Sequence, residues 1–189
     1  MILEIVKYGD PILRAKGARI EKITAEIRKL IEDMFDTMHA AAGVGLAAQQ
    51  VGRALQLTVI DVRGAKDRPS TLELDGKAAD VAGYMPLVLI NPEIRPFGEQ
   101  AKGPEGCLSF PEIYADISRP ESVEVRALNV EGKPIHFAAG GLLARAVQHE
   151  TDHLNGILFI DRMSSSSKAE LKGELQVLQE ETKARLAEK

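Results

Sequence analysis

The stretch AAGGLLARAVQHETDHLN, residues 138–155, contains no proline, is rich in leucine and alanine, and is followed directly by Gly156. Leucine and alanine have high helix propensity, and a glycine after such a stretch commonly ends a helix. We therefore predict a helix over 138–155, despite the Gly140–Gly141 pair near its beginning. Because the stretch is apolar on most sides, we expect this helix to be buried at the centre of the fold.

Two further helices are predicted on either side of this central one. Between Thr24 and Ala42, apolar residues recur at steps of three and four. This spacing is typical of an amphipathic helix, with Thr24 as its N-cap and Gly43 as its stop. Near the other end of the chain, four serines at 164–167 predict a linker before a charged C-terminal helix.

Short runs rich in β-forming residues lie between these helices and predict a small sheet, mostly antiparallel or mixed. They are Leu57–Val62, Leu87–Ile90, Ser122–Ala127 and Pro134–Phe137. Residues 63–83, with several glycines and charges, are predicted to be a long mobile excursion between two strands, and we assign them no chemistry.

The elements are segregated rather than alternating as strand–helix–strand units, which favours an α+β fold. We expect small, mostly antiparallel or mixed sheets around the central helix, with the amphipathic helix before them and the charged helix after them. The 189 residues, 28% charged and 44% hydrophobic, fit one globular domain. Residues 1–163 are expected to form its core, and residues 164–189 the serine linker and the C-terminal helix.

Charge and cysteine content restrict the partners and the compartment. A formal charge of -4 indicates no basic surplus, so we expect neither a specific nucleic-acid partner nor a membrane surface. The N-terminal apolar stretch is interrupted by Glu4 and Lys7, which does not support a signal peptide. Cys107 is the single cysteine and cannot form an intrachain disulfide. We expect a cytoplasmic protein.

The central helix carries the motif HExxH, formed by His149, Glu150 and His153. A separation of four residues stacks both imidazoles on one helical face, where each can offer a nitrogen to the same metal ion. The adjacent Glu150 is placed to move protons. Two solvated histidines beside an ordinary acidic pair are the alternative, which the apolar surroundings disfavour because buried imidazoles need partners.

A catalytic metal site needs a third protein ligand, and the sequence offers more than one. Metzincins would require a histidine where Phe159 stands, which disfavours that class. Glu170 or Glu174 could serve as in thermolysin-like endopeptidases, but both lie in the charged C-terminal helix and are better interpreted as solvated. Cys107, in the turn-like segment EGCLSFP, is a good ligand as a thiolate, although a lone cysteine is often only buried packing.

A third segment, GVGLAAQQVG at residues 43–52, combines small residues with two side-chain amides. Glycines permit close approach of the backbone to a ligand, and an amide can donate a hydrogen bond to a developing oxyanion. On its own the segment is better interpreted as a helix C-cap and a tight turn with two solvated glutamines.

Together, GVGLAAQQ (43–50), EGCLS (105–109) and QHETDH (148–153) resemble the three motifs of the peptide deformylase family. The resemblance covers nearly the whole chain and implies a metal-dependent hydrolase that removes the N-formyl group from the formyl-methionine of new polypeptides, releasing formate. It further implies one divalent metal ion, typically Fe²⁺, with Zn²⁺, Ni²⁺ or Co²⁺ as alternatives, bound by Cys107, His149 and His153.

The same resemblance implies roles for other residues. Glu150 would be the general acid and base, and Gln50 with the backbone N–H of Leu108 would form the oxyanion hole. The substrate would lie beside five residues: Val44, Gly45, Glu105, Gly106 and Leu142. The partner would be a formyl-methionyl nascent peptide, with a transient ribosome contact sought on the C-terminal helix.

The resemblance also implies one ion pair, and the chain departs from it at two positions. Glu105 and Arg119 match positions that pair in relatives, so we expect an ion pair that braces the cysteine segment. Arg145 stands where an apolar residue is usual, and Tyr114 where arginine is frequent, which puts the side-chain preference in doubt. Two other classes stay open: a zinc endopeptidase with a histidine or glutamate as third ligand, and a non-catalytic metal module. The module would need a fourth protein ligand, but there is no second cysteine, and His39 and His136 lie in unrelated segments.

Overall fold

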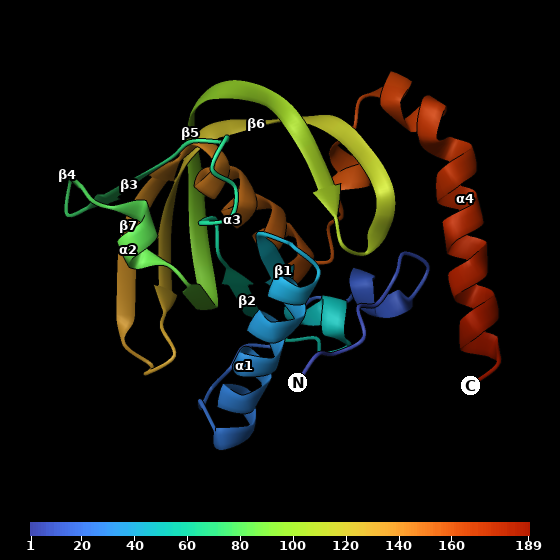
Figure 1. Cartoon of the computed structure of the whole chain (residues 1–189), viewed down its shortest axis with the longest axis horizontal. Helices are drawn as coiled ribbons and strands as arrows, with labels where there is room; N and C mark the ends of the chain where they lie inside the picture. The colour runs from blue at the N-terminus through green and yellow to red at the C-terminus, as the bar shows by residue number, and fades with distance from the viewer.

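The computed structural model describes residues 1–189 and has the predicted α+β architecture, with one continuous sheet in place of several small ones (Figure 1). The strand order is β1-β2-β5-β6-β7-β3-β4, and every neighbouring pair is antiparallel. The strands are β1 (Gly45–Ala47), β2 (Leu57–Ile60), β3 (Ser70–Leu74), β4 (Lys77–Ala78), β5 (Leu87–Cys107), β6 (Phe110–Leu128) and β7 (Pro134–Gly140).

The helices surround this sheet, and one of them lies inside its curve (Figure 1). The α-helices are α1 (Ala25–Ala40), α2 (Val81–Tyr84), α3 (Gly141–Leu154) and α4 (Ser165–Ala187), and the 3-10 helices are η1 (Pro11–Arg14), η2 (Ala48–Val51) and η3 (Phe159–Arg162). The predicted central helix is α3. None of the helices has both the length and the apolar character that a membrane-spanning helix requires.

Strands β5 and β6 are much longer than the sequence predicts, and together they form a bent hairpin that arches over α3 (Figure 1). Register shifts interrupt the pairing at three places, the last of them at Gly106/Cys107. Such irregularities bend a strand and re-aim its side chains, and they often occur beside active sites. Glycines and prolines between 91 and 106 obscure the strand pattern in the sequence.

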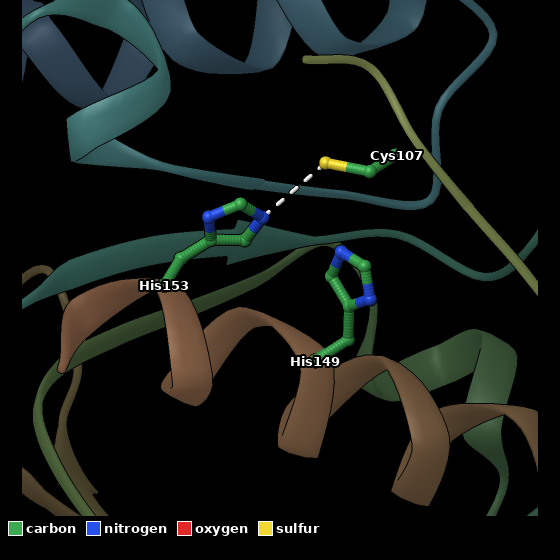
Figure 2. A group of neighbouring side chains, drawn as sticks. All are labelled: Cys107, His149 and His153. Atoms are coloured by element: carbon green, nitrogen blue, oxygen red, sulfur yellow. Dashed lines mark hydrogen bonds between the residues drawn. The ribbon is translucent and has the colours of Figure 1, made fainter. Parts of the chain in front are cut away.

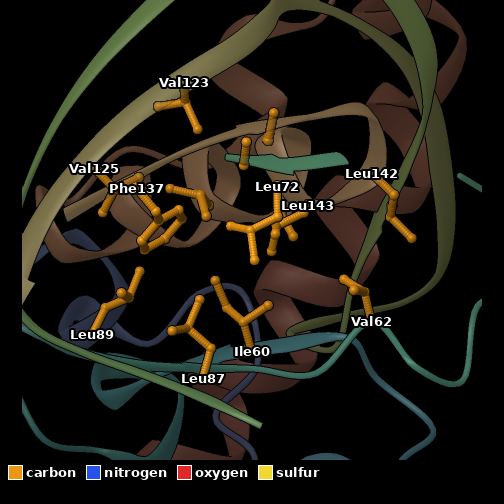
Figure 3. Close-up of a cluster of buried hydrophobic side chains, with 14 of the residues drawn as sticks. Ile60, Val62, Leu72, Leu87, Leu89, Val123, Val125, Phe137, Leu142 and Leu143 are labelled. Carbon is orange, nitrogen blue, oxygen red and sulfur yellow. The ribbon is translucent and has the colours of Figure 1, made fainter. Parts of the chain in front are cut away.

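The prediction of a mobile excursion at 63–83 is wrong. Strand β3 lies in this segment and pairs with β7, with Leu72 opposite Ala139. Leu72 is 2% exposed and belongs to the principal core between the sheet and α3, which Figure 3 shows. The segment contains few apolar residues, so its burial depends on partners that are distant in sequence.

The central helix begins three residues later than predicted, because Ala138–Gly140 complete β7 instead. Gly140 pairs with β6 and β3 at the same time. Gly141 then adopts φ +66, a left-handed conformation that redirects the chain into α3. An added Cβ at Gly141 would lie 2.3 Å from the Pro69 carbonyl oxygen, so this turn requires glycine.

The flanking helices also differ from the prediction in their ends. Thr24 caps α1 as expected, but Ala42, at φ +54, makes the left-handed turn that was expected of Gly43. The serines at 164–167 are not a linker, because Ser164 is the N-cap of α4 and accepts a hydrogen bond from the Ser167 N–H at 3.2 Å. Helix α4 packs its leucines against a small apolar cluster around Phe110 and Phe159.

Candidate metal centre

Helix α3 and the end of β5 bring three ligand side chains together (Figure 2). His149 and His153 project from consecutive turns of α3, and Cys107, the last residue of β5, points towards both. The Cys107 Sγ lies 3.3 Å from the His153 Nε2. One ligand atom from each of the three residues lies within 4.8 Å of the other two, a spacing that allows a single ion to bind all three.

The surroundings of the two imidazoles fit a metal ion. The Nδ1 of His149 is 2.8 Å from the Glu105 Oε1, which leaves the Nε2 of His149 for the metal. A carboxylate behind a ligating histidine sets its tautomer and orientation. His153 is 1% exposed and its Nδ1 has no partner within the protein. A thiolate and two imidazoles suit iron, zinc, cobalt and nickel better than magnesium or calcium.

The two histidines differ in pKa because their electrostatic surroundings differ. Burial lowers the pKa of His149, but its hydrogen bonds to Cys107 and Glu105 outweigh burial and raise that pKa to about 10. Burial, together with the positive charges of His149 and Arg119, lowers the pKa of His153 well below its ordinary value. Since a ligating imidazole nitrogen must be unprotonated, metal binding opposes the protonation that Glu105 and Cys107 favour at His149.

Glu150 lies against the backbone of β1. Its side chain is buried, and its Oε2 has no hydrogen-bond partner in the protein. Burial raises the pKa of Glu150 to about 7. A Cβ added to Gly45 would lie 2.7 Å from the Glu150 Oε1. The first glycine-rich motif thus leaves room for this carboxyl group, which the sequence pattern alone does not reveal.

The two glutamines of the same motif have different environments. Gln50 accepts a hydrogen bond from the Ala47 N–H at 2.9 Å, and its Nε2 lies 3.1 Å from the Ser109 Oγ and 3.5 Å from the Cys107 Sγ. Gln49 instead directs its amide nitrogen to backbone carbonyls at Ala15 and Leu154. Gln50 is therefore held beside the cysteine, and Gln49 is not.

A cavity of about 540 Å³ opens onto these groups. With the exception of His153, which lies deeper, every predicted site residue lines it: Val44, Gly45, Gln50, Glu105, Gly106, Cys107, Leu108, Leu142, His149 and Glu150. A Cβ at Gly106 would lie 2.6 Å from the ring of Tyr114, so a larger residue there would displace that exposed ring. The fold thus gathers three segments that are far apart in the sequence around one cavity.

Comparison with known proteins agrees with this geometry. Residues 2–169 match the family described as Polypeptide deformylase. The peptide deformylase of Methylacidiphilum infernorum is 48% identical over 93% of this chain and 92% of its own length, and that of Opitutus terrae is 45% identical over 97% and 96%. The crystal structure of Arabidopsis thaliana peptide deformylase 1B with an inhibitor has a TM-score of 0.83 at 38% identity, over 97% of this chain and 93% of that one.

The chain belongs to the polypeptide deformylase family. It is accordingly a hydrolase that removes the N-formyl group from nascent peptides, and Cys107, His149 and His153 form the metal-binding site typical of the family. The alternative ligands lie elsewhere: Glu170 and Glu174 are exposed on α4. His39 pairs with Asp61, and His136 with Glu124.

The predicted brace behind the site is confirmed and is larger than expected. Arg119 contacts the Glu105 carboxylate at 2.6 and 2.9 Å. Asp152 bonds the same arginine at 2.9 Å and also pairs with Arg162. Asp152 is a variable position inside HExxH, so the sequence motif did not indicate its role.

Arg145, which departs from the family pattern, also belongs to this network. In the structure its guanidinium lies 2.8 Å from the Glu105 Oε2 and lines the cavity. Burial raises the pKa of Glu105, but His149 and Arg119 outweigh burial and hold that pKa well below its ordinary value. Glu105 thus stays ionised while it orients His149.

Proposed function

We propose that Glu150 is the general acid and base of the deformylation. Three carboxylates line the cavity, at Glu105, Glu112 and Glu150. Glu105 is held by two arginines and His149, and Glu112 is exposed. Glu150 is buried with one oxygen unpartnered, and this observation carries the proposal. Its carboxylate takes a proton from the attacking water and then delivers it to the departing amine nitrogen.

Cys107, His149 and His153 would hold the metal, which we propose to be Fe²⁺, with Zn²⁺, Ni²⁺ or Co²⁺ able to replace it. The donor set suits all four ions, and the family resemblance favours iron. When bound, the metal supplies Lewis acidity that polarises the formyl carbonyl and acidifies water. Glu105, braced by Arg119, keeps His149 in the ligating orientation.

Gln50 and the backbone N–H of Leu108 are proposed to hold the formyl oxygen as it becomes negative. The Nε2 of Gln50 is directed towards Cys107 and Ser109, so it is fixed before substrate binds. Leu108 is similarly restrained, because its carbonyl accepts a hydrogen bond from the Lys7 Nζ at 3.1 Å. Donors that are oriented in advance stabilise a developing charge without reorganisation.

The substrate peptide is proposed to lie along Val44 and Gly45, with its methionine side chain near Gly106 and Leu142 and with Glu105 beside it. Strand β1 is the edge of the sheet, and an edge strand can pair with an extended peptide. Specificity beyond the first residue is expected to be weak, because the backbone contacts of an added strand are independent of sequence.

The deciding experiment measures formate release from a formyl-Met tripeptide, beside cleavage of casein, by metal-loaded and by chelated protein. We expect formate from the metal-loaded protein only, and intact casein. Casein cleavage without formate would favour the endopeptidase alternative. No activity with full metal content would favour a non-catalytic metal module.

The ligand role of Cys107 has its own test. Replacing Cys107 with serine exchanges a thiolate for a much poorer ligand of iron or zinc. We expect Cys107→Ser, purified without oxygen, to lose most of its metal by elemental analysis and to lose activity with it. Full metal content in this variant would show that the thiol is not a ligand. In the unaltered protein the same analysis identifies the metal.

A cytoplasmic location and a transient contact with the ribosome are also proposed, because the substrate is a newly made chain. The C-terminal part, residues 164–189, is the candidate contact, since it forms a long charged helix on the outside of the core 1–163 (Figure 1). Cosedimentation with ribosomes should therefore fall when Lys168, Lys172 and Lys183 are changed to glutamate, while formate release from a tripeptide stays normal.

A further inference from the structure

Arg145 occupies a position from which it can contact the substrate. It lies on α3 three residues after Leu142 and four before His149, so these three side chains share one helical face. All three line the 540 Å³ cavity. One turn of helix, about 5.4 Å, separates Arg145 from His149. The side chain of a substrate's first residue, which begins next to the formylated nitrogen, reaches that far.

The guanidinium of Arg145 is fixed but not saturated. Its Nη1 bonds the Glu105 Oε2 and the Ile117 carbonyl, both at 2.8 Å, and its Nη2 bonds the Ala101 carbonyl at 2.8 Å. One N–H on Nη2 and the Nε–H have no partner in the protein. The Arg145 side chain is 11% exposed, and its unpartnered Nε is not a fully buried atom. The Nε–H is therefore accessible to a ligand.

A second arginine lies at the same end of the cavity. Arg68, Leu142 and Arg145 also line a neighbouring cavity of about 530 Å³, so these residues form the junction between the two. Arg68 donates to the Pro104 carbonyl at 3.3 Å, and no carboxylate of the chain forms an ion pair with it. A Cβ at Gly103 would lie 3.2 Å from the Arg145 Nη2, so a glycine there makes room for the guanidinium.

We propose that Arg145, assisted by Arg68, determines which N-terminal side chains the enzyme accepts. The two guanidiniums give the far end of the slot hydrogen-bond donors, so the slot takes a first side chain that ends in an acceptor, such as methionine sulfoxide, as well as methionine. Oxidation of methionine to the sulfoxide turns an apolar tip into a polar one, and charged donors form strong hydrogen bonds with such a tip. The inference rests on the proposed placement of the first side chain in this cavity.

The test compares kcat/KM for two tripeptides that differ by one oxygen, formyl-Met and formyl-methionine sulfoxide, and follows their ratio. The proteins are the unaltered enzyme, Arg145→Met, Arg68→Met and the control Lys66→Met, each with its metal content measured. Lys66 is a basic residue in the same segment as Arg68 and does not line the catalytic cavity. Methionine keeps the length of the side chain and removes its donors.

We expect the sulfoxide-to-methionine ratio to fall at least about tenfold in Arg145→Met, as for loss of a hydrogen bond from a charged donor. A smaller fall is expected in Arg68→Met and none in Lys66→Met. If Arg145→Met fails to fold or to hold metal, the ratio in Arg68→Met decides.

Three results would overturn the proposal. The first is an unaltered enzyme that rejects the sulfoxide peptide, and the second is a ratio that stays constant in both arginine variants. In the third, Arg145→Met loses activity on both peptides equally, in which case Arg145 only braces Glu105. Failure of the proposed function differs from all three, because formyl-Met itself would then release no formate.

Discussion

At the scale of single residues, the site depends on how closely Glu150 approaches the glycine-rich motif. The carboxyl group lies against Gly45, one oxygen has no partner, and burial raises its pKa to about 7. An ordinary glutamate would be ionised and solvated at neutral pH. The backbone of β1 and the interior of α3 together give this side chain properties that suit proton transfer.

Changing Glu150 to glutamine separates proton transfer from metal binding. Glutamine keeps the size of the side chain but cannot accept the proton of water. We expect formate release to fall at least about a hundredfold, with metal content near that of the unaltered protein. Elemental analysis and kcat provide the two readouts. Loss of metal would make Glu150 a ligand, and retained activity would require another proton carrier.

Gly45→Ala tests the close contact between the backbone of β1 and the Glu150 side chain. The added methyl group would lie 2.7 to 2.9 Å from three atoms of the Glu150 side chain, so the carboxyl group must move. Because Cys107 and both histidines are untouched, we expect metal content to stay normal while kcat falls about tenfold or more. Gly52→Ala offers a comparison in the same segment with no atom within 4 Å of the new group, although its φ of +81 costs stability. Unchanged kcat in Gly45→Ala would show that Glu150 need not be held where the structure has it.

At the scale of elements, helix α1 ends in a strained residue that also lines the cavity. The N–H groups of Ala42 and Gly43 bond the carbonyls of His39 and Met38, at 3.1 and 3.0 Å, which is the hydrogen-bond pattern of a Schellman motif. That motif places a left-handed residue at 42, where glycine is usual. Ala42 occupies it at φ +54 and also lines the catalytic cavity.

Ala42→Gly should therefore stabilise the protein. A left-handed conformation costs an L-residue roughly 1 to 2 kcal/mol, and part of this is offset by the larger entropy of glycine in the unfolded chain. We expect a net gain of about 0.5 to 1 kcal/mol in urea unfolding. Ala41→Gly is the matched control: φ at Ala41 is -91, so glycine brings no relief there and should destabilise. Equal effects at both positions would contradict the assignment of strain to Ala42.

At the scale of the whole molecule, α4 is part of the fold and not a tail on a linker. Its leucines Leu171, Leu175 and Leu178 pack against the apolar cluster that contains Phe110 and Phe159. Phe110 directly follows the turn after Cys107, and the Cys107 side chain also packs against this cluster. The C-terminal helix thus supports the segment that supplies the metal ligand.

Shortening a leucine of α4 should consequently weaken the whole domain. Leu175 is partly buried, so Leu175→Ala is expected to lower the free energy of unfolding by about 1 to 2 kcal/mol. Val177, 54% exposed on the same helix, is the control, and Val177→Ala should change it by less than about 0.5 kcal/mol. Urea unfolding followed by circular dichroism measures both. If the core keeps its midpoint in Leu175→Ala, residues 164–189 form an independent unit.

The sequence by itself determined the features that are local. The HExxH spacing places two imidazoles on one face of any helix, and the stripe after Thr24 predicts α1, because both patterns depend only on helical periodicity. The three motifs indicated the family and the third ligand, since they are short and their chemistry is restrictive. The α+β class followed from the segregation of helices and strands.

Only the tertiary structure decided the features that depend on distant partners. Residues 63–83 contain few apolar side chains, so β3 forms a strand only because the backbone of β7 supplies its hydrogen-bond partners. The long hairpin of β5 and β6 forms across prolines and glycines because each strand supplies the other's hydrogen bonds. Arg145 and Asp152 show no local pattern at all. Their roles arise because Glu105 on β5 pairs with Arg145, and Arg119 on β6 pairs with Asp152. Ion pairs between residues so far apart in the sequence leave no periodic pattern in it.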